Sequence, residues 1–255
     1  MSRRIPTGFP ALDQLLGGGV RREDLVVLGG DSGSGCSALA LGIAVRAATA
    51  GHTVAVLSTE MSATRIAERA LALSAKATLD ELAGDALLDH RRAEIATVAL
   101  RLRELPISFQ SQPVEGWPID LRAAADHWDL LVVDCLEGLE VDGRAPSDAA
   151  ALRVAALKRL AIGRDAAVLL VVHSSDSPAS RADRRPAIGD FTASAALRQH
   201  ADLILGLYRE ELYDADLGIA GAAEVRVLKD RHGAGGTIDL FFTPRWLRFE
   251  DLGED

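Results

Sequence analysis

Short apolar, β-branched segments alternate with helical segments along most of the chain, and this alternation predicts a parallel β-sheet flanked by helices. The segments expected to be strands of that sheet are 25–29, 53–58, 107–110, 130–134, 168–173 and 203–208. Segments rich in Ala, Leu and Arg with helical periodicity are 63–75, 79–105 and 149–163. The pattern therefore indicates an α/β fold, with helices on both faces of a mostly parallel central sheet.

The last part of the chain has a different pattern. Residues 223–228, 237–243 and 246–250 lie around Gly-rich turns, which is typical of antiparallel hairpin strands. Residues 174–186 are rich in Ser, Asp, Arg and Pro and are expected to form a loop. The sequence contains no internal repeat and no linker, so we expect residues 1–255 to form one domain with C-terminal β-hairpins.

Composition excludes several classes of protein. Apolar residues make up 48% of the 255 residues, but no run approaches the roughly 20 residues of a membrane span. The N-terminus leads into no signal-peptide core, so we expect a cytoplasmic protein without a membrane partner. The formal net charge of −9 argues against a general nucleic-acid coat, which needs a basic surface, but leaves a local DNA groove open.

The strongest motif is a phosphate-binding loop without its lysine. Residues 30–37 read Gly-Asp-Ser-Gly-Ser-Gly-Cys-Ser and match G-x-x-x-x-G-K-[ST] except at Cys36. An apolar run precedes the loop and a helical segment follows it, so backbone N–H groups at the helix N-terminus can cradle an anion. The ammonium is missing and Asp31 adds a negative charge. The candidate nucleotide-binding residues are Gly30, Gly33, Ser34, Gly35, Cys36 and Ser37.

Residues 5–19, which read IPTGFPALDQLLGGG, lead directly into this loop. Together they resemble the start of the RecA-like ATPase domain of the DnaB family of replicative hexameric DNA helicases. Further similarity follows in order along nearly the whole chain, at LSTEMS (57–62), LLVVD (130–134), DRRP (183–186), QHAD (199–202) and LKDRHG (228–233). The resemblance implies a RecA-like P-loop NTPase domain that uses Mg²⁺ with ATP or ADP. The chain starts almost at this domain, so we expect no N-terminal collar domain.

The resemblance also implies roles for individual residues. Glu60 would position the attacking water, while Ser37 and Asp134 would hold Mg²⁺. Lys229 and Arg231 would reach the nucleotide of a neighbouring subunit and stabilise developing charge there. Each residue also has a non-catalytic alternative. Glu60 could be a solvated acid at a strand end, and Asp134 could form a turn. Lys229 and Arg231 could be surface residues of a hairpin.

The departures from the family pattern fall at the nucleotide and at the DNA. His173 stands where the family usually has a Gln that senses the nucleotide. In the DNA-loop segment, whose candidate residues are Arg184, Arg185, Thr192 and Ser194, Thr192 replaces an Arg that lies where single-stranded DNA passes. Ala193 and Ala195 replace the family's Glu and Gly. Loss of a charged, fork-shaped donor predicts weakened binding of single-stranded DNA.

Cys36 permits two interpretations. A thiol at a helix N-terminus tends to have a lowered pKa, which would make Cys36 reactive and able to form a disulfide with Cys135. A reducing cytosol favours an inert thiol instead.

Three functions are consistent with these features. The one we favour is a degenerate DnaB-type relative that binds nucleotide or a partner and hydrolyses ATP weakly or not at all. The second is an active ATP-dependent DNA helicase or translocase in replication with an unusual loop. The third is an interaction subunit that binds no nucleotide and offers Lys229 and Arg231 to a related ATPase ring. The expected protein partners are copies of this chain in a ring or related helicase subunits.

Overall fold

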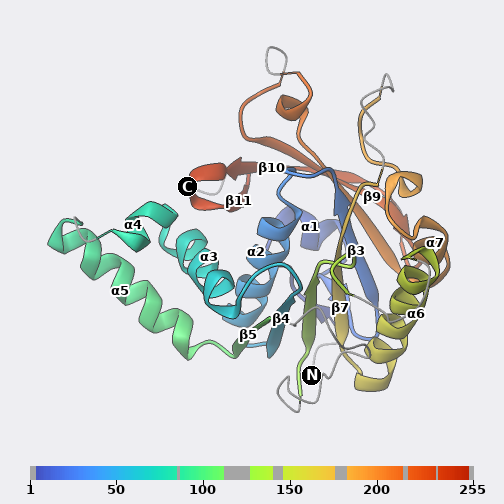
Figure 1. Ribbon diagram of the computed structural model, residues 1–255, viewed down its shortest axis with the longest axis horizontal. Helices are drawn as coiled ribbons and strands as arrows, with labels where there is room; N and C mark the ends of the chain where they lie inside the picture. Colours follow the sequence, from blue (N-terminus) through green and yellow to red (C-terminus); the bar gives the residue numbers. More distant parts are fainter. Residues whose placement is uncertain are drawn as a thin grey trace.

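The computed structural model describes residues 4–84, 87–111, 127–139, 146–175, 183–214, 218–233 and 235–252. Within them, one large sheet has the strand order β11–β10–β9–β8–β3–β7–β6–β4–β5 (Figure 1). Its parallel part consists of β3 (Leu25–Gly30), β4 (Val54–Ser58), β5 (Ile107–Ser111), β6 (Leu130–Asp134), β7 (Ala167–His173) and β8 (Leu203–Tyr208). All six strands expected from the apolar segments are therefore confirmed.

The C-terminal part of the sheet is antiparallel, as the hairpin pattern predicts. It contains β9 (Ala222–Asp230), β10 (Thr237–Thr243) and β11 (Arg248–Asp251). The last strand begins two residues later than expected, because Pro244–Trp246 form a short 3₁₀ helix and Leu247 has a φ of 55°. Near the N-terminus, β1 (Arg4–Ile5) and β2 (Val20–Arg21) pair in a separate two-stranded sheet.

The helices are α1 (Pro10–Leu15), α2 (Cys36–Thr49), α3 (Ala63–Ala75), α4 (Leu79–Ala83), α5 (Asp89–Glu104), α6 (Pro146–Arg164) and α7 (Ser194–His200). The single long helix expected over 79–105 is wrong. A capping box at Thr78 starts α4, and Gly84, which has extended backbone angles, ends it. A second helix then begins at Asp89. Residues 176–182 of the loop expected at 174–186 lie outside the described residues.

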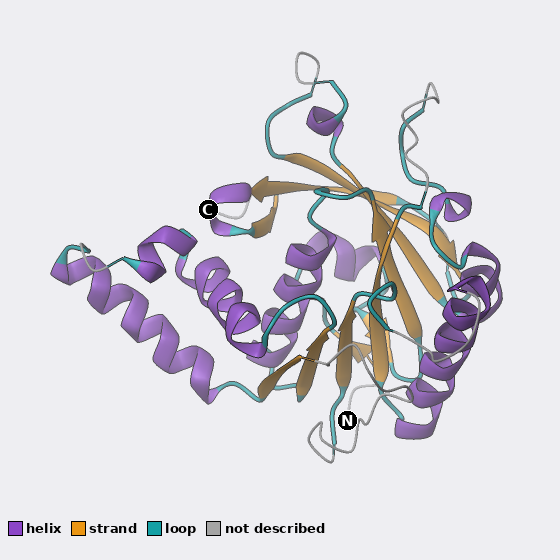
Figure 2. Cartoon of the chain, viewed as in Figure 1, coloured by secondary structure: helices purple, strands orange, loops and turns teal. Residues whose placement is uncertain are grey.

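Two hydrophobic cores lie on opposite faces of the sheet, and Figure 2 shows helices on both sides of it. Successive side chains of a strand point to opposite faces, so Val26 and Leu28 of β3 pack into the core that contains α2, while Leu25 and Val27 pack into the core of α6 and α7. A strand buried on both faces reads as a continuous apolar run, which is the pattern seen in this sheet. None of the described helices has the length and apolar character to cross a bilayer.

The strand order decides which residues can meet. Because β8, β3, β7, β6 and β4 are parallel neighbours, the segments that follow their carboxyl ends emerge at one edge of the sheet. This edge, which we call the carboxyl edge, carries the glycine-rich loop after β3. It also carries the ends of β6 and β7, at Asp134 and His173.

Candidate functional site

The glycine-rich loop joins β3 to α2 and has the backbone that its sequence predicts. Gly33 and Gly35 have φ angles of +80° and +102°, which glycine adopts without strain. A Cβ at Gly30 would lie 2.7 Å from Ser34 Oγ and 2.8 Å from the carbonyl oxygen of Leu207. Gly35 caps α2 without a side chain, so backbone N–H groups of the first helical turn face the loop without a capping oxygen. These donors are what an anion cradle needs.

Cys36 is buried at the base of this cradle, with its side chain turned away from solvent. Its Sγ lies 3.4 Å from Ser34 Oγ. Burial raises the pKa of the thiol to about 12, and the charges of Asp134 and Asp31 act in the same direction. The structure therefore does not support the interpretation that rests on a lowered pKa, because burial of the thiol acts in the opposite direction.

Cys135 is buried as well, and both cysteines are free thiols. Burial, assisted by the nearby Glu137 and Glu60, also raises the pKa of Cys135. The Cys36–Cys135 disulfide that the sequence left open is not present, and two protonated, buried thiols favour the inert interpretation of Cys36.

Ser37 and Asp134, the two residues expected to hold Mg²⁺, are in direct contact. The Ser37 hydroxyl donates to Asp134 Oδ1 over 2.9 Å. Burial raises the pKa of Asp134, and the charge of Glu60 adds to this, although the Ser37 hydrogen bond opposes it. A hydroxyl and a carboxylate are oxygen ligands of the kind that Mg²⁺ prefers. The structure therefore brings a suitable ligand pair to the start of α2.

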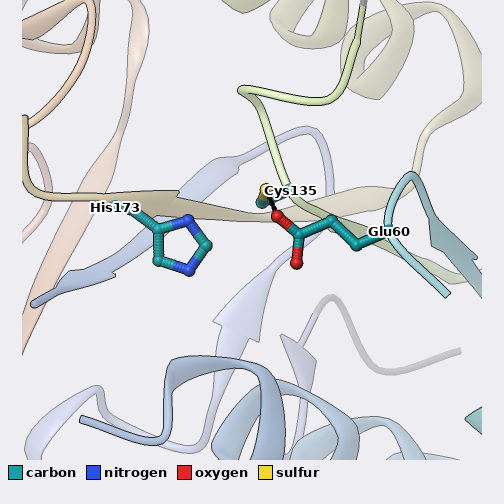
Figure 3. A group of neighbouring side chains, drawn as sticks. All are labelled: Glu60, Cys135 and His173. Atoms are coloured by element: carbon teal, nitrogen blue, oxygen red, sulfur yellow. Dashed lines mark hydrogen bonds between the residues drawn. The ribbon is translucent and has the colours of Figure 1, made fainter. Parts of the chain in front are cut away.

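Glu60 and His173 flank Asp134, because β6, which ends at Asp134, lies between β4 and β7 in the sheet. Glu60 follows β4, and its Oε1 accepts a hydrogen bond from Cys135 Sγ at 3.3 Å. His173 ends β7, and its backbone N–H donates to Glu137 Oε1 over 3.0 Å while its Nδ1 lies 3.6 Å from Glu137 Oε2. The bond with Glu137 raises the pKa of His173, and the charges of Glu60 and Asp134 add to this effect. Figure 3 shows the Glu60 carboxylate at the Cys135 sulfur, with the His173 ring on the other side.

Two residues beside the loop were missed by the sequence analysis. Arg209 is buried and donates from Nη1 to the carbonyl oxygen of Gly33 over 3.1 Å, while its Nε binds Glu211. Tyr213 donates its hydroxyl to Asp31 Oδ2. Both follow β8, which neighbours β3 in the sheet. Strand order is not visible in the sequence, so the apolar pattern gave no signal that this segment lies against the loop.

The DNA-loop segment is in contact with the carboxyl edge. Ser174 forms a bridge with Phe191, and the Thr192 N–H approaches the carbonyl oxygen of His173 at 3.4 Å. Ser194 begins α7, after Ala193 at a φ of 58°. The segment therefore lies next to the position of the expected nucleotide sensor.

The two arginines of this segment are bound within the chain. Arg184 donates from Nη1 to the carbonyl oxygen of Tyr213 over 2.9 Å. Arg185 Nε contacts both carboxylate oxygens of Glu224, at 2.9 and 3.0 Å, and its guanidinium lies over the Tyr208 ring. Because of these contacts, the two guanidinium groups have fewer N–H donors available for an external phosphate.

Lys229 and Arg231 lie at the opposite edge of the sheet, where β8 begins, and not at this chain's own loop. Lys229 Nζ donates to the carbonyl oxygens of Arg198 and Ala201 at 2.7 and 2.5 Å. Arg231 Nη1 donates to Asp202 Oδ1 over 2.8 Å. A role for either cation at a nucleotide would therefore be one in trans, as the resemblance implies.

Comparison with known proteins agrees with this arrangement. A family model described as "DnaB-like helicase C terminal domain" matches residues 4–251. The replicative DNA helicase DnaB of Geobacillus stearothermophilus is 28% identical over 258 residues, which cover 97% of this chain and 56% of the relative. That of Haemophilus influenzae is 29% identical over 265 residues, with coverages of 98% and 56%. The chain thus spans little more than half the length of these relatives.

Solved structures show the same fold at lower identity. One solved ATPase domain superimposes with a TM-score of 0.88 at 23% identity, covering 97% of this chain and 91% of the other. A structure entitled "The Structure Of A DnaB-Like Replicative Helicase And Its Interactions With Primase" gives the same TM-score and identity, over 97% and 63%. The RadB recombinase gives a TM-score of 0.59 at 20% identity, over 97% and 99%. The predicted RecA-like fold is confirmed, and with the family model covering nearly all of the sequence, this chain belongs to the DnaB-like helicase C-terminal domain family.

Proposed function

We propose that this chain is a degenerate DnaB-like domain that keeps the ATPase scaffold but hydrolyses ATP weakly or not at all. The observation that supports this most is the buried, protonated thiol of Cys36 at the position of the loop lysine. We place this single RecA-like domain in the cytoplasm.

The charge around the loop supports the same proposal. Asp31, Asp134 and Glu60 are acidic, and the pKa of Asp134 is raised by burial and by Glu60. Arg209 reaches the loop through the Gly33 carbonyl oxygen, but Glu211 already pairs with its guanidinium. An ammonium at position 36 would offset the acids and meet the outer phosphates. Its loss removes about 3 kcal/mol of transition-state stabilisation, by comparison with other preorganised donors.

Other residues beside the loop fit Mg²⁺, the ion that DnaB-family helicases use with ATP. Ser37 and Asp134 are the residues that would hold Mg²⁺, because their oxygens already meet at 2.9 Å. When bound, the ion would neutralise phosphate charge. Glu60 stands at the end of β4, where it can orient a water, although its Oε1 accepts the Cys135 thiol. The site therefore keeps candidate residues for Mg²⁺ and for the attacking water, but lacks the loop lysine.

The active-helicase alternative has one observation in its favour. A hollow beside the loop is lined by Asp31, Ser32, Ser174, Ser175, Arg184, Leu212 and Tyr213. Of these described residues, only Arg184 is cationic. If the phosphates of a bound nucleotide entered this hollow, Arg184 could bind them in place of the missing lysine.

Partners follow from the family and from the placement of two cations. We propose that Lys229 and Arg231 act only in a ring, of this chain or of related subunits, because both lie at the edge of the sheet away from the loop. Binding of single-stranded DNA is proposed to be weak, since Arg185 is held by Glu224. A primase-type partner is a further proposal, by likeness to the helicase whose structure describes that interaction.

The test is calorimetric titration of Mg·ATP and Mg·ADP into the wild-type protein, Cys36→Lys and Cys36→Met. The methionine variant is the matched control, because it lengthens the side chain without adding charge. We expect Cys36→Lys to bind nucleotide at least about tenfold more tightly than the other two.

Two results would change the proposal. Wild-type ATP turnover at ordinary enzyme rates, abolished by Glu60→Gln, would overturn the proposal and favour the active-helicase alternative. Loss of nucleotide binding in Arg184→Gln would then identify the substitute cation. If neither wild type nor Cys36→Lys binds nucleotide, the interaction subunit is the better description.

A further inference from the structure

A second group of metal-ligand side chains lies beside the Ser37–Asp134 pair. Glu60, Cys135 and His173 each offer one ligand atom, and these three atoms lie within 4.8 Å of one another. They come from the ends of three strands, β4, β6 and β7, which are neighbours in the sheet. The parallel register, which pairs Ser58 with Asp134, fixes how these strand ends lie side by side. The cluster is thus held by the rigid part of the fold.

We propose that Glu60, Cys135 and His173 bind a divalent transition metal, with Zn²⁺ as the best fit. A thiolate, an imidazole and a carboxylate are the three side-chain types that bind zinc in proteins. Three protein ligands leave a fourth tetrahedral position open to water or to a small ligand. The site differs in kind from the Ser37–Asp134 pair, whose oxygens suit a hard ion such as Mg²⁺.

The distances are close to those of a zinc site. Zinc–ligand bonds of ordinary length place neighbouring tetrahedral ligand atoms roughly 3.5 Å apart. Cys135 Sγ and Glu60 Oε1 are already 3.3 Å apart. The remaining separations, at most 4.8 Å, close with a movement of about an ångström of the half-exposed His173 ring or the exposed Glu60 carboxylate. The backbone of Cys135 is held at the end of β6, where its N–H donates to Thr59 Oγ1 over 3.1 Å.

Glu137 fixes the position of His173 beside the cluster. Its Oε2 lies 3.6 Å from His173 Nδ1, and it also accepts the backbone N–H of the same residue. A carboxylate partner of this kind orients a metal-binding histidine. Glu137 therefore acts as a positioning residue for the proposed site.

The charge at the cluster also favours a cation. Glu60 belongs to it, Asp134 directly precedes Cys135 in the chain, and Glu137 lies beside His173, so three carboxylates place negative charge there. Metal binding would convert the Cys135 thiol to a thiolate and release its proton to solvent. This inference needs neither a nucleotide nor the identity of residue 36, so it stands apart from the proposed function.

The experiment is a titration of metal-stripped, tag-free protein with Co²⁺ under anaerobic conditions, followed by competition with Zn²⁺. Co²⁺ bound to a thiolate gives a charge-transfer absorption in the near ultraviolet, which reports the Cys135 bond directly. We expect one equivalent of Co²⁺ to produce the band and one equivalent of Zn²⁺ to remove it. Cys135→Ser should abolish the band, while Cys36→Ser, the matched change at the other buried thiol, should retain it.

A second variant keeps the test decisive if Cys135→Ser does not fold. His173→Gln changes a half-exposed side chain and should weaken Zn²⁺ binding at least about tenfold, whereas His90→Gln, at an exposed histidine of α5, should not. Circular dichroism confirms the fold of each variant. The proposal is wrong if wild type shows no charge-transfer band, if the band survives in folded Cys135→Ser, or if His173→Gln binds Zn²⁺ as tightly as wild type.

Discussion

The two edges of the parallel sheet each bury an aspartate that has a second acid nearby, but the donors that the two aspartates receive differ in charge. At the edge where β3 and β8 begin, Asp202 is almost fully buried and receives Lys158 Nζ at 2.6 Å, Arg231 Nη1 at 2.8 Å and the Leu25 N–H at 2.8 Å. At the carboxyl edge, the Asp134 carboxylate receives the uncharged hydroxyl of Ser37, and Glu60 adds charge of the same sign.

This difference indicates a structural role for Asp202 and a ligand-binding role for Asp134. An acid whose hydrogen bonds and charge are satisfied within the chain stabilises the fold, and its removal leaves buried partners unpaired. A buried acid that receives no charged donor costs stability, which is common where a site is built to meet a ligand. Three substitutions test this distinction, in order of expected effect.

Asp202→Ala should have the largest effect on stability. It leaves Lys158 without its carboxylate and the Leu25 N–H without an acceptor, so we expect the free energy of unfolding to fall by about 3 kcal/mol. Urea unfolding of wild type and variant measures the change. Asp239→Ala, on an exposed position of β10, is the control and should change stability by no more than about 0.5 kcal/mol. Equal losses in both variants would contradict the structural role of Asp202.

Asp134→Asn should have a small effect of the opposite sign. The amide oxygen can still accept the Ser37 hydroxyl, while the repulsion from Glu60 disappears, so we expect equal or higher stability at pH 7 in metal-free buffer. Because the folded pKa is raised, wild type should lose stability as pH rises from about 3.9, the unfolded pKa, to the folded pKa. Asp134→Asn should lack that loss. A large destabilisation at pH 7 would show that the two edges are built alike.

His173→Gln should have the smallest effect and should be visible in the pH dependence. Glu137, Glu60 and Asp134 raise the pKa of His173, so its contribution to stability is complete below the unfolded pKa of about 6.5. That contribution should be lost as pH rises through the folded pKa. Thermal unfolding between about pH 5.5 and 8.5 should therefore show a decline in wild type that is absent in His173→Gln. Identical slopes would mean that Glu137 does not hold an imidazolium.

Much of the fold could be predicted because the core strands carry their own signal. The doubly buried runs at β3, β6, β7 and β8 were continuous and apolar, and each was placed within a residue or two. The break between α4 and α5 was missed, because the polar helical period continues across Gly84. Helical period alone cannot show where a helix stops when both helices are largely solvent-exposed.

Only the site residues that belong to sequence motifs could be predicted. The loop, Asp134 and Glu60 followed from spacing and resemblance, and the structure brings Ser37 to Asp134 and Glu60 to Cys135. The sequence left two interpretations of Cys36 open, and only tertiary packing, which buries the thiol and raises its pKa, favours the inert one. Arg209 and Tyr213 could not be found, since only the sheet order places β8 next to the loop.

The bonds from Arg209 to the Gly33 carbonyl and from Tyr213 to Asp31 mean that neighbouring segments of the protein hold the loop in shape. A loop braced in this way does not depend on a nucleotide for its order. Selection for a stable fold would then preserve the cradle even where selection for ATP turnover had ceased. A pocket of this kind can persist without ATP hydrolysis and remain available for another ligand.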